Sequence, residues 1–475
     1  MRHTLKLYRL NGFLCQIWLG EEIPETGNAI GQLPKVIATL KTLQTPPVEI
    51  DSILPPLFVT GIRHLLTCAW WPRLWVLQEA TLARDAIFIC GSYLVSWKLL
   101  SALVKQIKRL HLYSLFRRND HRIEFCDGFS EIHNIELVRH THSDTLAPNL
   151  LRICRQRICF DPCDRVYAVI GLMDKYVQEG FVWEPGEKVE DLYPPFVAIL
   201  LRMDPTAMLL SLNETTQRNP HLPSWCPDLH YRSLNDVLAD YEGYHAGFTI
   251  QTTTTFDFDQ NDPGKIRTKG IIMDTVETIS SEEWAADATD GHLPESPPFS
   301  TEQRNIMLLQ SYIAIALKMV EKKDIWRIFI GNMIGQQNSK LHWLAGFSSI
   351  HDRLANRRWK EEAKKFQTCF HDLQVWSPGT GEPSPAIRFY LKNARRVCYG
   401  RKLFTTKAGH IGLGPRSMTV GDHVCILKCA KVPFVLKKHP TQSDTYYLRG
   451  EAYVQGLMYG EYLKVNKGFY WITLV

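Results

Sequence analysis

Residues 70–91 read WWPRLWVLQEATLARDAIFICG and combine a helical pattern with an apolar run. Pro72 suits the first turn of a helix, where the missing N–H costs nothing. Trp75 and Glu79 then fall one turn apart on the same helical face. The apolar run Ala86–Cys90 predicts a short buried strand. The stretch therefore predicts a helix that leads into a sheet and carries a carboxylate one turn from an indole.

Neighbouring segments extend this α/β pattern. A second apolar run, Phe13–Leu19, predicts a strand, and we expect it to lie beside Ala86–Cys90 in one sheet, because short apolar runs bounded by turns suit a buried sheet. Prolines and glycines recur through Pro24–Pro56, which predicts a long connection with at most one short helix. A further helix is predicted from about Trp97 to Arg117.

Several blocks resemble the fungal heterokaryon-incompatibility (HET) domain. Arg73-Leu74-Trp75-x-x-Gln78-Glu79-x-x-Leu82-Ala83 is similar to the central signature of that family. Further similar blocks are Ile17–Glu22, which contains Trp-Leu-Gly, Asp161–Leu172, which reads Asp-Pro-x-Asp-x-Val-Tyr-Ala-x-x-Gly-Leu, and Leu222–Asp228, which reads Leu-Pro-Ser-Trp-x-Pro-Asp. Blocks between Arg401 and Glu461 resemble the tail that these fungal proteins usually carry.

Two blocks of the family pattern are not found in the sequence. Family members open with a Ser-Tyr-x-Trp-Gly strand and an Ile-Asp-x-x-Cys-Ile-Asn-Gln block. We therefore expect a member that lacks the N-terminal part of the HET domain, through truncation or a mispredicted start at Met1. The resemblance implies that residues 1–117 are the C-terminal part of that domain, an incomplete TIR-like or flavodoxin-like α/β unit.

The remainder of the chain predicts a mixed α/β, or α+β, protein with two further regions. Residues 145–395 are expected to mix helices and strands. The expected elements are helices at Thr301–Lys322 and His351–Thr368 and strands at Phe248–Phe256 and Lys265–Ile279. Residues 396–475 are expected to form a small antiparallel β-barrel without a catalytic site. Gly412-x-Gly414 is interpreted as turn glycines, because no helix or lysine follows to complete a phosphate cradle.

The block Asp161–Leu172 is explained by helix capping. Asp161 is a good N-cap, Pro162 fits the first helical position, and Asp164 favours the positive end of the helix dipole. Gly171 suits a left-handed C-terminal cap. We therefore interpret this block as a structural helix.

Charge and cysteine content limit the classes of function. Residues 351–475 hold 21 Lys and Arg against 9 Asp and Glu, yet the predicted helix within them mixes both signs, which favours a solvated surface over a nucleic-acid site. Charges interrupt the longest apolar stretches, and no leader is evident, so we expect a cytoplasmic protein with no membrane span. Cys154, Cys159 and Cys163 lie near His140 and His142 in sequence, but buried thiols are favoured over a metal site, and no metal or cofactor is expected.

Glu79 is the one candidate for chemistry, and two roles remain open. The HET family has been suggested to be distantly related to TIR domains, which implies NAD cleavage with Glu79 as the catalytic carboxylate and Trp75 in support. A carboxylate can stabilise the oxocarbenium-like state of such a cleavage. The other role, which the residues themselves favour, is a structural one in which Glu79 pairs with Arg73, Arg84 or a backbone N–H.

The resemblance thus implies an effector of fungal self/non-self recognition that triggers cell death, with NAD hydrolysis in a complete chain. The alternative is a catalytically inert interaction module or degenerate fragment. Expected partners are other proteins of the incompatibility system or a second copy of the chain, with NAD as substrate and no nucleic acid. We expect the 475-residue chain by itself to be inactive.

Overall fold

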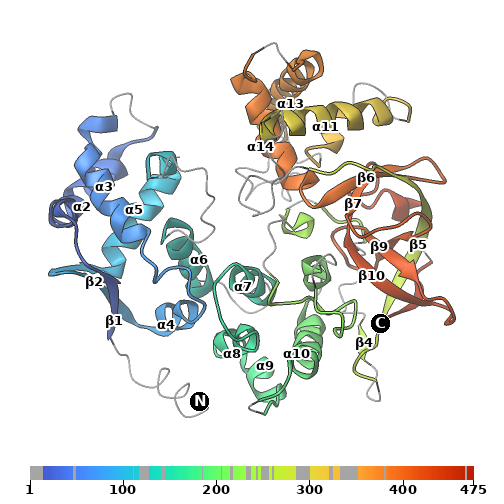
Figure 1. Ribbon diagram of the computed structural model, residues 1–475, viewed down its shortest axis with the longest axis horizontal. Helices are drawn as coiled ribbons and strands as arrows, with labels where there is room; N and C mark the ends of the chain where they lie inside the picture. The colour runs from blue at the N-terminus through green and yellow to red at the C-terminus, as the bar shows by residue number, and fades with distance from the viewer. Residues whose placement is uncertain are drawn as a thin grey trace. The chain divides into compact units, whose positions relative to one another are not determined.

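The computed structural model divides into two compact units, Met1–Leu192 and Tyr193–Val475, each described below by itself (Figure 1). The structure describes residues 14–45, 50–110, 112–116, 128–140, 146–184, 186–204, 206–213, 218–231, 237–241, 244–247, 256–258, 262–284, 300–319, 325–331, 351–378, 381–465 and 468–475.

The first unit contains a three-stranded sheet. Its strands are β1 (Leu14–Gly20), β2 (Asp85–Cys90) and β3 (Tyr93–Ser96), in the order β1-β2-β3. β1 and β2 run parallel with Ile17 opposite Phe88, whereas β2 and β3 are antiparallel. The prediction that Phe13–Leu19 and Ala86–Cys90 contribute neighbouring strands of one sheet is confirmed.

Helices account for most of the rest of this unit. They are α2 (Pro24–Thr42), α3 (Pro56–Leu66), α4 (Val76–Leu82), α5 (Trp97–Arg109), α6 (Gly128–His140), α7 (Leu146–Arg155), α8 (Asp164–Ile170) and α9 (Lys175–Gly180), with short 3₁₀ helices at Ile50–Ser52 and Tyr113–Phe116. α2 and α5 contact each other and β3, and they pack on the sheet face that carries Ile17, Phe88 and Val95. α5 ends at Arg109, eight residues before the predicted end at Arg117.

Helix α2 corrects the prediction for Pro24–Pro56. That segment contains a helix of 19 residues rather than a connection with at most one short helix. Pro24 occupies the first turn, where it needs no N–H partner, and Leu33, Ile37 and Leu40 form a buried face. Burial of this face outweighs the cost of Pro34 inside the helix.

The capping predicted for Asp161–Leu172 is also wrong in detail. Helix α8 begins at Asp164, with Cys163 as its N-cap, and the Asp161 carboxylate instead accepts a hydrogen bond from the Cys163 N–H at 2.9 Å. Gly171 ends the helix with a right-handed φ of −66°. The aspartate and proline therefore form the turn before the helix, and the helix itself starts two residues later than predicted.

The second unit contains a nine-stranded sheet. Its strands are β4 (Asp257–Phe258), β5 (Ile266–Ile279), β6 (Arg401–Thr406), β7 (Ile411–Pro415), β8 (His423–Leu427), β9 (Phe434–Lys438), β10 (Thr445–Glu451), β11 (Tyr453–Val454) and β12 (Tyr470–Leu474). Five strands form a closed ring of paired neighbours in the order β5-β8-β9-β10-β12, because β12 pairs again with β5. Outside this ring, β6 pairs with β5, β7 pairs with β6, and β11 pairs with β7.

The mixed α+β fold is confirmed, but the C-terminal strands do not form a clean antiparallel barrel. β10 and β12 run parallel, with Thr445 opposite Thr473. The predicted strand Lys265–Ile279 corresponds to the long strand β5, which pairs with β6, β8 and β12. Of the other predicted strand, Phe248–Phe256, residues 248–255 lie outside the described residues.

Close packing explains the glycines of β7. Gly412 and Gly414 lie within this strand rather than at the predicted turn. A Cβ atom on Gly412 would meet the Tyr453 carbonyl and the Phe404 ring, so the glycine leaves room for that ring in the core.

The α-helices of the second unit either precede β4 or lie between β5 and β6 in the sequence. They are α10 (Val189–Met203), which begins before the unit boundary, α11 (Thr301–Ala316), α12 (Ile325–Ile328), α13 (His351–Val375) and α14 (Pro385–Cys398), with 3₁₀ helices at Met208–Leu212, Leu238–Asp240 and Tyr462–Lys464. The predicted helices near Thr301 and His351 are confirmed. None of the helices within the described ranges has both the length and the apolar composition required to cross a membrane.

The Leu-Pro-Ser-Trp block anchors this sheet. The Ser224 N–H donates to the Val475 carbonyl at 2.9 Å, and the Ser224 hydroxyl accepts from the Leu448 N–H at 2.8 Å. The Trp225 indole donates to the Gly264 carbonyl at 2.9 Å. These bonds give the block a structural role, because they join it to the middle of β10, to the residue after β12 and to the turn before β5.

Candidate functional site

Two of the family-like sequence blocks meet in the first unit. Residue Ile158, just before the Asp161 block, pairs with Arg73 as an isolated parallel bridge. The Leu74 N–H donates to the Ile158 carbonyl at 2.9 Å, and the Ile158 N–H donates to the Pro72 carbonyl at 2.6 Å. Because this bridge commits the Pro72 carbonyl and the Leu74 N–H to Ile158, α4 begins at Val76 and not at Pro72 as predicted.

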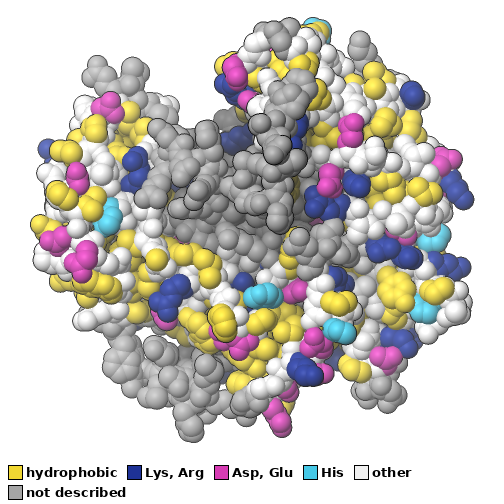
Figure 2. Space-filling view, viewed as in Figure 1, with side chains coloured by type: hydrophobic (Ala, Val, Ile, Leu, Met, Phe, Trp, Pro, Cys, Tyr) yellow, Lys and Arg dark blue, Asp and Glu magenta, His cyan; other side chains and the backbone are white. Residues whose placement is uncertain are grey.

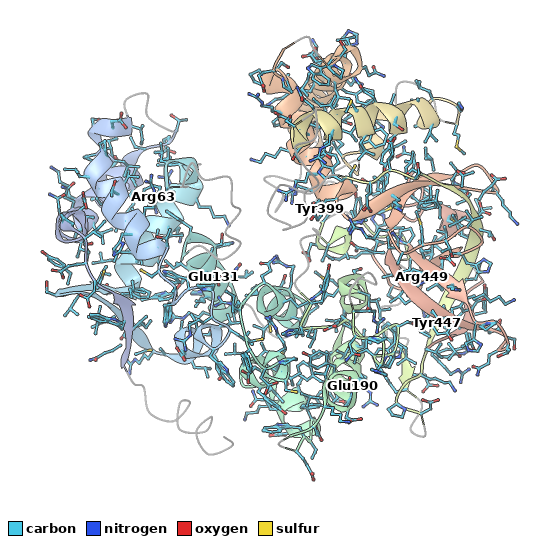
Figure 3. The ribbon with its side chains drawn as sticks, viewed as in Figure 1. Arg63, Glu131, Glu190, Tyr399, Tyr447 and Arg449 are labelled. Carbon is cyan, nitrogen blue, oxygen red and sulfur yellow. The ribbon has the colours of Figure 1, made fainter. Side chains whose placement is uncertain are left out.

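A buried ion pair fixes the approach to α4. The Arg157 guanidinium pairs with the Glu131 carboxylate, and the two side chains are 0% and 1% exposed. Glu131 lies on α6 (Figure 3). Arg157 also donates to the carbonyls of Trp71 at 3.3 Å and Arg73 at 3.2 Å. Sequence patterns did not identify this pair, because a charged residue looks the same in sequence whether it is buried or exposed.

Trp75 connects α4 to α8. It is the N-cap residue of α4, and its indole N–H donates to the Asp164 carboxylate at 3.1 Å. Burial raises the pKa of Asp164, and the Trp75 hydrogen bond opposes that rise. This hydrogen bond joins the two blocks, whose bonded residues are 89 positions apart in the sequence, and it fixes the start of α4.

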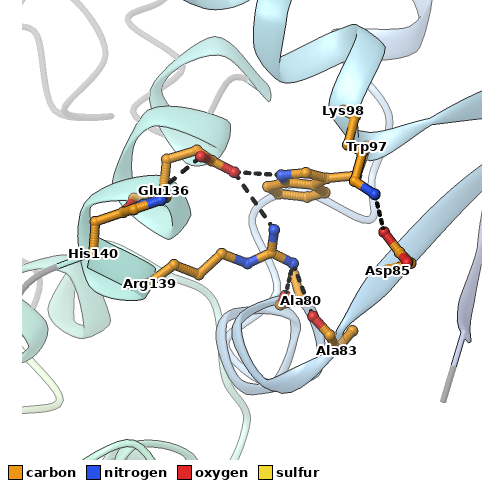
Figure 4. A network of polar contacts seen from close by, with 8 residues as sticks. All are labelled: Ala80, Ala83, Asp85, Trp97, Lys98, Glu136, Arg139 and His140. Carbon is orange, nitrogen blue, oxygen red and sulfur yellow. Dashed lines mark hydrogen bonds and ion pairs between the residues drawn. The ribbon is translucent and has the colours of Figure 1, made fainter. Parts of the chain in front are cut away.

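Arg139 holds the other end of α4. Its guanidinium donates to the carbonyls of Ala80 and Ala83, the latter at 3.3 Å, and these carbonyls belong to the last turn (Figure 4). The same group lies 4.7 Å from the centre of the Trp97 ring. Glu136 accepts from both Arg139 and the Trp97 indole. The final carbonyls of the helix are thus satisfied by a cation, which also suits the helix dipole.

The Glu79 carboxylate lies half-buried in the first turn of α4. Among the described residues its side chain has no hydrogen-bond or ion-pair partner, so the structure brings neither Arg73 nor Arg84 to it. Burial and then the charge of Glu79 raise the pKa of the Cys15 thiol on β1, so the two groups are close enough to interact. A rigidly mounted carboxylate without a partner is able to accept hydrogen bonds from a ligand or stabilise a developing positive charge.

A second polar side chain of α4 is also unused by the fold. Gln78 is 8% exposed, and its amide nitrogen has no hydrogen-bond partner among the residues that the structure describes. The Thr81 hydroxyl is buried and unpartnered in the same way. Sequence analysis placed Gln78 in the signature block but gave it no role, because burial of an amide cannot be read from helical spacing.

Cys154, Cys159, Cys163 and His140 were considered for a metal and lie within the described residues. The described residues contain no group of three or more His, Cys, Asp and Glu side chains able to hold a metal ion. Cys154 is buried, its thiol donates to the Arg165 carbonyl at 3.4 Å, and burial raises its pKa to about 12. His142 lies outside the described residues.

The second face of the three-stranded sheet carries an exposed apolar row. Trp18 lies opposite Ile89, and Ile89 lies opposite Leu94 on the next strand. Trp18 is 53% exposed and Leu94 is 60% exposed. Figure 2 shows hydrophobic side chains gathered on the visible surface over the first unit. Strands of a parallel pair are usually covered on both faces, so this row is a candidate contact surface.

Comparison with known proteins identified a family for the C-terminal part. Residues 384–472 match the family described as the Het-6 beta-barrel domain. The chain is 22% identical over 458 aligned positions to the Neurospora crassa protein named heterokaryon incompatibility protein 6, OR allele, covering 82% of this chain. The match spans 64% of the length of that relative. No solved structure matches the chain.

Proposed function

We propose that this chain, a HET domain-containing fungal protein, acts in heterokaryon incompatibility, the process by which fungi distinguish self from non-self. The matches to the Het-6 family and to an incompatibility protein support this role. The match spans 64% of the relative's length, so the role of this protein in the same process is a proposal. We place the protein in the cytoplasm, with other incompatibility proteins as partners.

Within that role we assign NAD hydrolysis and the resulting cell death to Glu79. The observation that carries this assignment is the half-buried carboxylate of Glu79, which has no partner among the described residues. In the reaction, the bond between nicotinamide and the ribose C1′ breaks with its electron pair leaving on nicotinamide. Water then bonds to C1′ and loses a proton to solvent, which gives ADP-ribose. The carboxylate stabilises the positive charge that develops on the ribose.

The roles of Trp75 and Arg139 support this assignment indirectly. Each contacts one end of α4, Trp75 through Asp164 and Arg139 through the carbonyls of Ala80 and Ala83. Trp75 is therefore a positioning residue in this proposal. Fixing the helix at both ends reduces the reorganisation that the carboxylate would need during the reaction.

The assignment is tested by the incompatibility reaction of fungal strains that express Glu79→Gln. We expect this change to abolish cell death, because it removes the charge but preserves the shape of the side chain. Glu25→Gln is the matched control, since Glu25 is also a half-buried glutamate in the first turn of a helix of the same unit. Cell death that persists with Glu79→Gln at wild-type protein levels would remove Glu79 from the mechanism.

A second candidate function is that of a catalytically inert interaction module that self-associates. The row formed by exposed Trp18, half-buried Ile89 and exposed Leu94 favours it. Sedimentation of Leu94→Ser should then show loss of a dimer that Val420→Ser retains, since Leu94 and Val420 are similarly exposed at 60% and 64%. A monomeric wild-type protein at all concentrations would argue against this candidate.

A further inference from the structure

Two apolar side chains are exposed on the loop before α8. Phe160 is fully exposed, and Ile158 is 59% exposed. The backbone beneath them is fixed, because Ile158 pairs with Arg73 and the preceding residue, Arg157, forms the buried ion pair with Glu131. An ordered backbone loses little conformational entropy on binding, so apolar side chains exposed on it suit a contact with another protein.

Carboxylates lie beside these apolar side chains. Asp161 follows Phe160 directly and accepts from the Cys163 N–H at 2.9 Å, and the Cys163 thiol donates to the Glu187 carbonyl at 3.5 Å. Burial raises the pKa of the Cys163 thiol to about 11, and the Asp161 and Asp164 carboxylates contribute to that rise. Residues 158–191 hold eight Asp and Glu against three Lys and Arg. The result is an apolar and acidic surface, called here the Phe160 surface, which consists of Ile158, Phe160, Asp161 and Glu187.

The second unit carries a surface of the opposite charge. Trp471 on β12 is 40% exposed and lies opposite Lys269 on β5. The Arg267 guanidinium lies 5.0 Å and the Lys269 ammonium 5.2 Å from the centre of the Trp471 ring. Arg267 also pairs with Asp257 at 3.6 Å, and both of these side chains stay about half exposed. The result is an aromatic and basic surface, called here the Trp471 surface, which consists of Arg267, Lys269 and Trp471.

We propose that the Phe160 surface of one copy docks on the Trp471 surface of a second copy of this chain. Each surface combines an exposed aromatic ring with charges of mainly one sign, and the two signs are opposite, so the surfaces are complementary in both respects. Because the two surfaces differ, the contact is head-to-tail and joins copies into rings or open chains. The proposal does not depend on catalysis by Glu79, and it uses neither Trp18 nor Leu94.

Sedimentation velocity of the full-length protein tests this contact. The wild-type protein should form oligomers, and their dissociation constant should rise at least about tenfold between about 0.05 and 0.5 M NaCl, because salt screens exposed charges. Phe160→Ser should weaken self-association at least about tenfold, since it removes the aromatic anchor of one surface. Lys269→Glu should do the same by reversing a charge on the other surface.

A mixture of the two variants separates this contact from other modes of self-association. Phe160→Ser keeps the Trp471 surface, and Lys269→Glu keeps the Phe160 surface. Equal amounts should therefore form a dimer with one copy of each variant, which cannot grow further, whereas neither variant assembles alone at that concentration. Val420→Ser and Lys318→Glu are matched controls, since both residues are exposed in the second unit, and each should assemble as the wild-type protein does.

Three results would overturn the proposal. One is a wild-type protein that stays monomeric at all concentrations. Another is a mixture that stays monomeric, or an effect of Phe160→Ser without one of Lys269→Glu, because the Trp471 surface would then not be the occupant. The third is assembly that is lost with Leu94→Ser and kept with Phe160→Ser, which would assign self-association to the sheet of the first unit. None of these results alters the test of Glu79.

Discussion

Loss of the Glu131 carboxylate should destabilise the first unit more than any surface change. Glu131→Ala leaves the Arg157 cation 0% exposed without its counter-ion. Breaking a buried ion pair in this way typically costs about 3–5 kcal/mol of unfolding free energy. The bonds from Arg157 to the Trp71 and Arg73 carbonyls remain and compensate in part, so we expect about 3 kcal/mol.

The double variant Glu131→Leu with Arg157→Met separates the charge from the packing. It removes the ion pair without leaving a buried charge, which is often neutral for stability. It also loses the two bonds to the carbonyls of Trp71 and Arg73, each worth about 1 kcal/mol. The double variant should therefore lose about 2 kcal/mol, less than Glu131→Ala alone.

Urea unfolding, followed by hydrogen exchange of the α4 amides, reports the stability of this region. The control is Asp85→Asn, which breaks an ion pair with Lys98 whose side chains are 47% and 79% exposed, and should have almost no effect. A loss below about 1 kcal/mol for Glu131→Ala, or a double variant less stable than the single one, would refute the reasoning about Arg157.

Two further predictions concern backbone strain and protonation. Gly91 has a φ of +54°, and a Cβ there would meet the Glu22 carboxylate, so Gly91→Ala should lower the unfolding free energy by roughly 1–3 kcal/mol. Gly31→Ala, in the open on α2, should raise it by roughly 0.5–1 kcal/mol, and urea titration of both variants checks the opposite signs. Burial and then Lys438 lower the pKa of His423 below 6.5, so between that lowered pKa and 6.5 the folded state binds fewer protons than the unfolded state. The contribution of His423 to the unfolding free energy is complete above pH 6.5 and falls as pH drops through this window. Between pH 7.5 and 5.5, the His423→Gln protein should therefore lose less unfolding free energy than the wild-type protein. An equal loss in the two proteins would contradict the lowered pKa of His423.

Local patterns predicted the elements that depend on local chemistry. The apolar runs ending in Leu19 and Cys90 predicted two neighbouring strands of one sheet, and the structure shows that they run parallel. The same reasoning failed at α2, because Pro24 and Pro34 were weighted as breakers although one lies in the first turn and the other is outweighed by a buried face.

The arrangement of the site could not be predicted from spacing alone. The start of α4 depends on the bridge between Arg73 and Ile158, and its orientation depends on the bond between Trp75 and Asp164. Both join residues more than eighty positions apart, so no helical or strand period reports them. Glu79 was proposed because its spacing from Trp75 resembles a family pattern, whereas the burial of Gln78 could be seen only in the fold.

The most direct test of the account is the rate at which the full-length protein, expressed from its own transcript, releases nicotinamide from NAD. We predict release by the wild-type protein and a rate at least about a hundredfold lower for Glu79→Gln at equal folded concentration, the range expected when a group that stabilises the transition-state charge is removed. Circular dichroism of both proteins confirms that the fold is retained. Equal rates for the two proteins, including no release by either, would contradict the assignment of NAD hydrolysis to Glu79.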